Sequence, residues 1–194
     1  MDLLTQAVLG ATTAQTAAKP HETRIAIFTG ALAGLLPDAD ALIRSNTDPL
    51  LVLEYHRHFT HSLVFIPFGA AIVATLVWLF CRNRIEFNRI YLYALLGIAL
   101  SGILDACTSY GTHLLWPFSD TRIAWNLIAI VDPVFTLLLL VPLTIALHRK
   151  QARTARLGMI LATAYLMFAL VQHERATLVA EEMIASRGHQ AERL

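Results

Sequence analysis

Charged residues are scarce in this sequence. They make up 15% of its 194 residues, whereas an average soluble domain carries about 25%. Hydrophobic residues reach 56%, and the mean hydropathy is +0.57. This balance argues against a soluble globular protein, and the high apolar content excludes a disordered chain. The sequence therefore predicts a single integral membrane domain over residues 1–194.

Other features are also missing, and each absence excludes a class of protein. The two cysteines, Cys81 and Cys107, are far apart in the sequence, so we expect neither a CxxC zinc site nor an internal disulfide. The net charge is only +1, and no basic block is typical of a nucleic-acid-binding protein. The GxSxG, Walker A and GxGxxG signatures are absent. Membrane lipid is the partner that this composition favours.

Six apolar stretches indicate membrane helices, each of which needs about 20 mostly apolar residues. The four strong ones are Ser62–Phe80, Ile90–Ser109, Ile123–Leu147 and Leu157–Gln172. Two shorter ones, Leu3–Ala18 and Ile25–Leu36, precede them. We interpret these as a packed hairpin, because Gly30 and Gly34 have the spacing that lets helices approach closely; half-inserted or interfacial helices are the alternative. The sequence thus predicts an all-α, polytopic membrane helical bundle with a polar C-terminal tail at 174–194.

Basic residues predict the orientation of this bundle. They concentrate in the loops 81–89 and 148–156 and in the turn at 19–24, which the positive-inside rule makes cytoplasmic. The segments 37–61 and 110–122 then face the periplasm or the exterior. We therefore expect a multi-pass protein of a bacterial-type inner membrane.

Asp38, Asp40 and three histidines lie within residues 38–61, on the predicted outer side. Because Pro37 disfavours helix in the residue before it, Asp38 and Asp40 fall on irregular backbone, where two carboxylates can converge on a cation. Neutral imidazole, offered by His56, His58 and His61, is a common ligand for borderline metals. A solvated turn and an interfacial polar anchor with Arg57 snorkelling are the alternatives. The clustering of these residues favours a metal site.

Asp105 and Asp132 are acidic residues within predicted apolar stretches. A carboxylate costs roughly 3 kcal/mol at the bilayer centre, so Asp105 is a functional candidate, with Ser101 on the same helical face. A hydrated carboxylate near the outer helix end is the alternative. Asp132 precedes Pro133, the usual pairing of an N-cap with Pro at the first helical position, and we interpret it as structural.

The order of these motifs resembles the YdjM family, whose members are described as membrane-bound, metal-dependent hydrolases. The matching motifs are Leu36-Pro37-Asp38-Ala39-Asp40, His56-Arg57-His58-Phe59-Thr60-His61-Ser62, Asp105, and Tyr110-Gly111-Thr112-His113-Leu114-Leu115-Trp116-Pro117. The family looks distantly similar to zinc-dependent phospholipase C. The resemblance therefore implies a phosphoesterase-type site with a divalent metal, most simply Zn²⁺. It implies the following metal ligands: Asp38, Asp40, His56, His61 and Asp105.

This sequence departs from the family pattern at two positions. Gln6 and Ser101 stand where many members have histidine. Gln6 can supply one carbonyl oxygen, Ser101 is a poor metal ligand, and His58 or His113 can act as additional ligands instead. The departures leave open fewer bound metals or a loss of catalysis.

Taken with these residues, the resemblance implies hydrolysis of a phosphoester, in a lipid or a lipid-linked substrate, by metal-activated water at the periplasmic face. Asp38 and Asp40 are the candidate catalytic carboxylates, since one that does not bind the metal can act as general base. Arg57 is expected to bind the phosphate through bidentate contacts. A non-catalytic metal-binding scaffold, a regulator or a small transporter in the membrane is the alternative.

Overall fold

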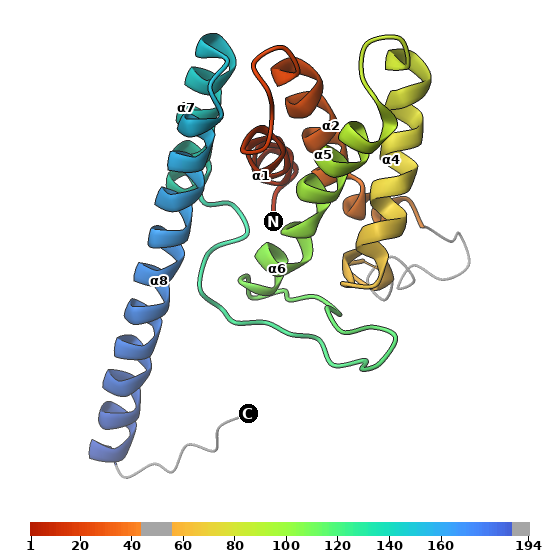
Figure 1. Cartoon of the computed structure of the whole chain (residues 1–194). Coiled ribbons are helices and arrows are strands. Elements are labelled where there is room, and N and C mark those ends of the chain that lie inside the picture. Colours follow the sequence, from red (N-terminus) through yellow and green to blue (C-terminus); the bar gives the residue numbers. More distant parts are fainter. Residues whose placement is uncertain (44–55, 188–194) are drawn as a thin grey trace.

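A computed structural model of the chain describes residues 1–43 and 56–187, which form helices joined by loops (Figure 1). Within these ranges there is no β-sheet, only an isolated bridge between Thr112 and Ile123. The elements are α1 (Leu3–Gln15), α2 (Thr23–Leu35), η1 (Pro37–Leu42), η2 (Phe59–His61), α4 (Phe65–Cys81), α5 (Phe87–Ala99), α6 (Ser101–Ala106), α7 (Pro133–Arg149) and α8 (Ala152–Ser186). The prediction of an all-α helical bundle is confirmed. Part of the predicted outer segment 37–61 and the end of the predicted tail lie outside the described residues.

Helix α1 lies in the middle of the bundle and contacts α2, α5, α7 and α8. Gly10 of α1 faces Gly30 and Gly34 of α2 and Gly97 of α5, and a Cβ atom on Gly10 would collide with the backbone oxygen of Gly30. Glycine at these positions lets the helix backbones approach closely. The two N-terminal helices therefore form the packed hairpin that the sequence predicts.

The outer surfaces of α4, α7 and α8 are apolar. Exposed large side chains include Phe68 and Phe80 on α4, Leu137 on α7, and Ile160 and Phe168 on α8. By length and composition, α8 and the α5–α6 pair over 87–106 are long enough to cross a membrane, whereas α2, α4 and α7 are shorter apolar helices. So much exposed apolar surface is costly in water and suits a lipid environment.

Helix α7 starts later than its apolar run suggests. The sequence predicts a helix over Ile123–Leu147, but residues 123–132 form a loop and the helix begins at Pro133. The backbone of that loop is held by the end of α6, because Trp125 N donates to Ala106 O at 2.7 Å. Asp132 is the N-cap and accepts a hydrogen bond from Phe135 N at 2.9 Å, so its predicted structural role is confirmed.

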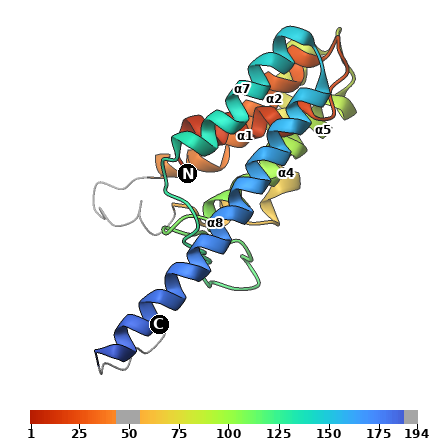
Figure 2. The same ribbon diagram turned by 90° about the vertical axis from the view of Figure 1, so that its left-hand side faces the viewer.

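Helix α8 is longer than the predicted stretch Leu157–Gln172. It has 35 residues, which at about 1.5 Å per residue gives roughly 52 Å, well beyond the ~30 Å hydrocarbon core of a bilayer. Figure 2 shows its C-terminal part running past the rest of the bundle. Residues 174–186 of the predicted polar tail are therefore helical.

Candidate metal centre

Asp40 joins the η1 turn to the histidine-rich segment that follows it in the described chain. Its Oδ1 lies 2.9 Å from His56 Nδ1, and its Oδ2 accepts hydrogen bonds from Arg57 N at 2.8 Å and Thr60 Oγ1 at 2.7 Å. Burial would raise the pKa of the Asp40 carboxyl, but the hydrogen bonds from His56, His61 and Thr60 outweigh it and hold that pKa well below its usual range. Asp40 is therefore a carboxylate whose oxygens are already occupied by protein donors.

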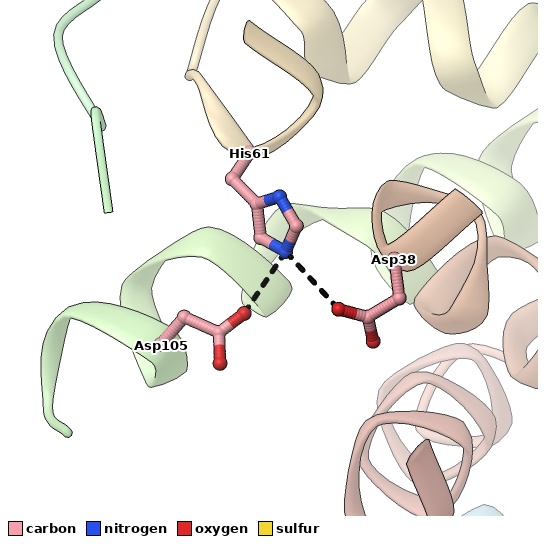
Figure 3. Close-up of side chains that lie close together, drawn as sticks. All are labelled: Asp38, His61 and Asp105. Atoms are coloured by element: carbon pink, nitrogen blue, oxygen red, sulfur yellow. Dashed lines mark ion pairs between the residues drawn. The ribbon is translucent and has the colours of Figure 1, made fainter. Parts of the chain in front are cut away.

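His61 is buried in η2 between three carboxylates that come from η1 and α6. Its Nδ1 lies 3.3 Å from Asp40 Oδ2. Its Nε2 lies 3.0 Å from Asp105 Oδ2 and 3.5 Å from Asp38 Oδ1 (Figure 3). Among the described residues, Nε2 has no hydrogen-bond partner. The imidazole thus has one nitrogen held by Asp40 and one nitrogen turned toward Asp38 and Asp105.

These three side chains have the chemistry of a metal-binding donor set. One ligand atom each from Asp38, His61 and Asp105 lies within 4.8 Å of the others. Ligands about 2.1 Å from a tetrahedral zinc ion are about 3.4 Å apart, close to the observed 3.0 and 3.5 Å. A carboxylate on the opposite nitrogen of a histidine is the usual support for a metal-bound imidazole, since it fixes the tautomer. Asp40 stands in that position, so the donor set fits a divalent cation.

Arg57 is the buried cation next to this cluster. Its NH2 lies 3.3 Å from Asp105 Oδ1, and its NH1 donates to Thr108 Oγ1 at 3.0 Å. The guanidinium also lies over the ring of Tyr110 at 5.0 Å. The Arg57 backbone has φ of 61°, a left-handed conformation that is costly for a side-chain-bearing residue. Its carbonyl accepts from His113 N at 3.1 Å, so the loop after α6 holds this conformation.

Gln6 and Ser101 reach the site in different ways. Gln6 Nε2 donates to Asp105 Oδ2 at 2.9 Å, and its Oε1 is buried with no hydrogen-bond partner in the described chain. The amino group of Met1 forms an ion pair with the other Asp105 oxygen. Ser101 Oγ instead donates weakly to Gly34 O, at 3.4 Å. Gln6 therefore orients Asp105, whereas Ser101 contacts the backbone of α2.

The remaining predicted ligands lie outside the Asp38–His61–Asp105 cluster. His56 binds Asp40, and its ring centroid is 6.5 Å from that of His61. His58 packs against His113, with ring centroids 4.7 Å apart, and against Trp116. Of the five ligands that the resemblance implies, the structure brings Asp38, His61 and Asp105 together. Asp40 contacts the opposite nitrogen of His61, and His56 contacts Asp40.

Sequence reasoning did not single out Thr60, and it considered Thr108 only as a hydrogen-bond partner of a hydrated Asp105. Thr60 hydrogen-bonds Asp40 and lies 3.1 Å from His61 Nδ1, and Thr108 receives the Arg57 guanidinium. Thr60 stands inside the histidine motif, and Thr108 follows Asp105 by three residues, so both were within reach of the motifs. Threonine near a helix end often bonds its own backbone, as Thr108 does at Asp105 O, so its added contact with Arg57 is not visible in the sequence.

Fold and site together define an all-helical membrane protein with a buried Asp–His–Asp cluster at one end of its bundle. The chain belongs to the YdjM inner membrane protein family, which it matches over residues 1–176. It is an inner membrane protein of that family.

Two curated proteins illustrate the relationship. The chain is 31% identical over 116 residues to the uncharacterized protein YfhP of Bacillus subtilis (strain 168), which covers 60% of this chain and 34% of YfhP. It is 32% identical over 111 residues to the inner membrane protein YbcI of Escherichia coli (strain K12), which covers 54% of this chain and 61% of YbcI. The match therefore spans only part of the length of each relative. No solved structure matches this chain.

Proposed function

We propose that this protein is a membrane-bound, metal-dependent hydrolase that cleaves a phosphoester in a lipid or lipid-linked substrate at the periplasmic face. The observation that supports the proposal most is His61 Nε2, which is buried without a hydrogen-bond partner in the described chain and lies between the carboxylates of Asp38 and Asp105. An unprotonated Nε2 beside two carboxylates favours a bound cation between them, in addition to the Met1 amino group and Arg57, which already pair with the other oxygen of Asp105. A doubly protonated imidazolium is the alternative that fits the same distances.

The contacts of each residue indicate its role in the proposed reaction. Asp38, His61 and Asp105 would hold the ion, and Asp40 would keep the His61 ring in the correct tautomer and orientation. A divalent ion such as Zn²⁺ supplies hydroxide at neutral pH because it lowers the pKa of water to about 7. Asp38 Oδ2 is buried and has no hydrogen-bond partner among the described residues, so it can accept the proton of the attacking water.

Arg57 is the residue suited to the phosphate. Its guanidinium lies beside Asp105, and a planar guanidinium can contact two phosphate oxygens at once. Its Nε is buried without a hydrogen-bond partner in the part of the chain described, which leaves a donor for a substrate. The contacts with Thr108 and Tyr110 would hold the side chain in place while the substrate binds.

The surroundings of the site favour a lipid or lipid-linked substrate. The loop that follows α6 exposes Leu115, Phe118 and Trp125, and aromatic side chains favour the interface between lipid and water. The basic loops at the opposite end of the bundle support a periplasmic position for this end. A phosphoester at headgroup level can then approach the site along the membrane plane.

Metal content of the purified protein tests the proposal. We expect about one zinc ion per chain after reconstitution, a loss of that zinc in His61→Ala and Asp38→Asn, and retention in His148→Ala, an exposed histidine at the other end of the bundle. Lipid phosphodiesters and soluble phosphodiesters are then supplied to the zinc-loaded protein as candidate substrates. Absence of zinc from wild-type protein under these conditions would favour the imidazolium and contradict the proposal.

A non-catalytic metal-binding role is the second candidate, and Gln6 is the observation that favours it. The resemblance implies histidine at this position, yet here the Gln6 amide donates to Asp105 and so competes for a ligand oxygen. Such a site has a single nitrogen donor among Asp38, His61 and Asp105. Stoichiometric zinc with no turnover of any phosphoester, in protein whose His61→Ala variant loses zinc, would identify a scaffold or regulator.

A further inference from the structure

A cavity lies at the end of the bundle opposite the metal centre. Its volume is about 440 Å³, which is within the range of ligand pockets. Its lining residues come from the turn that joins α1 to α2, the start of α2 and the C-terminal end of α7, which lie at the same end of the bundle in Figure 1. Met1, before the start of α1, pairs with Asp105, so a cavity beyond the end of α1 is separated from that site by the length of the helix.

The lining of this cavity is basic. It includes His21, Arg24, His148 and Lys150, and no acidic residue is among its described lining residues. The acid next in sequence, Glu22, is buried and engaged by Arg89, whose NH2 lies 2.7 Å from Glu22 Oε2.

Glu22 lies at the edge of the cavity and neutralises little of its positive charge. Its Oε1 lies 3.6 Å from His21 Nε2, and its other oxygen also accepts a hydrogen bond from Tyr93. Within the described residues, Arg24 and Lys150 form no ion pair. The cavity therefore carries two full positive charges that no neighbouring acid neutralises.

The ends of α2 and α7 also contribute to the electrostatic potential at the cavity. Thr23 and Arg24 are the first residues of α2, and Glu22, its N-cap, makes no side-chain hydrogen bond to that first turn in the described chain. The first N–H groups of a helix attract anions. The carbonyl end of α7 has the opposite effect, but Lys150 closes that end, where its backbone N–H donates to Ala146 O. The balance at the cavity favours an anion.

We propose that this cavity binds the phosphate group of an anionic membrane lipid. Basic pockets between membrane helices hold acidic headgroups in the cytoplasmic leaflet, and the basic loops predict that this end of the bundle is cytoplasmic. Leu147 gives the cavity an apolar wall, where the first carbons of an acyl chain can lie. A free phosphate ion offers the same chemistry without the chain, so the test separates these two sources.

Lipid retention by the full-length protein tests the proposal. The protein is reconstituted in phosphatidylcholine nanodiscs containing phosphatidylglycerol, and bound lipid is counted by native mass spectrometry after extraction. Each basic side chain beside an anionic headgroup is worth roughly a factor of five in affinity. We therefore expect the double variant Arg24→Gln, Lys150→Gln to bind phosphatidylglycerol about 25-fold more weakly than wild type.

A matched control removes the same charge from the turn between α4 and α5, where Arg82 and Arg84 are exposed. The double variant Arg82→Gln, Arg84→Gln should retain lipid as wild type does. Equal losses in the two double variants would mean that retention reflects general surface charge, and unchanged retention in the Arg24 and Lys150 variant would mean that the cavity is not the site. Either result overturns the proposal.

Two further measurements complete the test. The charge-conserving variant Arg24→Lys, Lys150→Arg should fold and retain lipid, which separates loss of charge from loss of structure. Inorganic phosphate is then added as a soluble competitor. If millimolar phosphate fails to displace phosphatidylglycerol, the result supports a lipid headgroup as the ligand. If low millimolar phosphate displaces the lipid, and the double variant Arg24→Gln, Lys150→Gln abolishes this effect, the ligand is a free phosphate anion and the lipid assignment is overturned.

Discussion

Replacing Asp40 with asparagine tests whether that carboxylate holds His61 toward a metal ion. Asp40 accepts hydrogen bonds from Arg57 N and Thr60 Oγ1, lies 2.9 Å from His56 Nδ1, and has its Oδ2 3.3 Å from His61 Nδ1. Asparagine keeps the shape of the side chain but removes its charge. It also turns one acceptor oxygen into an NH2 donor. That donor opposes Arg57 N at the Oδ2 position, and at the Oδ1 position it requires the His56 tautomer whose Nδ1 accepts.

The expected losses follow from these contacts. Residues that support a metal-bound histidine typically contribute 10–100-fold to metal affinity, so zinc affinity of Asp40→Asn should fall by roughly that factor. The fold should also lose stability. A hydrogen bond to a charged group is worth about 1.5–3 kcal/mol, and one lost contact with weakening of the others gives about 3 kcal/mol for the apo protein.

Zinc affinity is measured by competition with a chelator of known affinity, and stability by thermal unfolding of the metal-free protein in detergent. Asp120→Asn is the matched control, because Asp120 is an exposed carboxylate in the loop after α6, and it should behave as wild type. Unchanged zinc affinity in Asp40→Asn would refute the supporting role. Complete loss of zinc in a folded Asp40→Asn, as large as that in His61→Ala, would make Asp40 a ligand itself.

Three further predictions concern other parts of the chain. Asp132→Ala should destabilise the protein by about 2 kcal/mol in thermal unfolding, through loss of the α7 cap and of a hydrogen bond from α8, yet keep its zinc; zinc loss as complete as in a ligand variant would place Asp132 in the site. Gly10→Val should destabilise by about 3 kcal/mol or more, because its side chain would enter the backbone of Gly30, and wild-type stability would contradict the close helix approach. In cells expressing variants without the native cysteines, Thr121→Cys should react with an impermeant maleimide, whereas Arg84→Cys should react only after the inner membrane is permeabilised; the reverse pattern would invert the orientation.

Much of the helical architecture could be predicted from local sequence. Apolar runs located helices α1, α2, α4, α5, α7 and α8, because exclusion of charge from lipid acts on every residue of a helix separately. The Asp132 cap was predictable because an N-cap bonds its own first turn, here at Phe135. The start of α7 could not be predicted, because the backbone of Trp125 and its neighbours pairs with the end of α6. Hydropathy does not indicate which segments of the backbone pair with one another.

The candidate site, too, was predictable from the sequence only in part. The sequence by itself determined which residues carry its chemistry, since carboxylates and imidazoles near apolar runs are costly and few. Only the tertiary structure decided that Asp38, His61 and Asp105 converge, that Asp40 supports His61, and that His58 turns to His113. These side chains come from η1, the histidine segment, and α6 with the loop that follows it. Their distances depend on how closely α1, α2 and α5 approach, which glycine contacts between helices set.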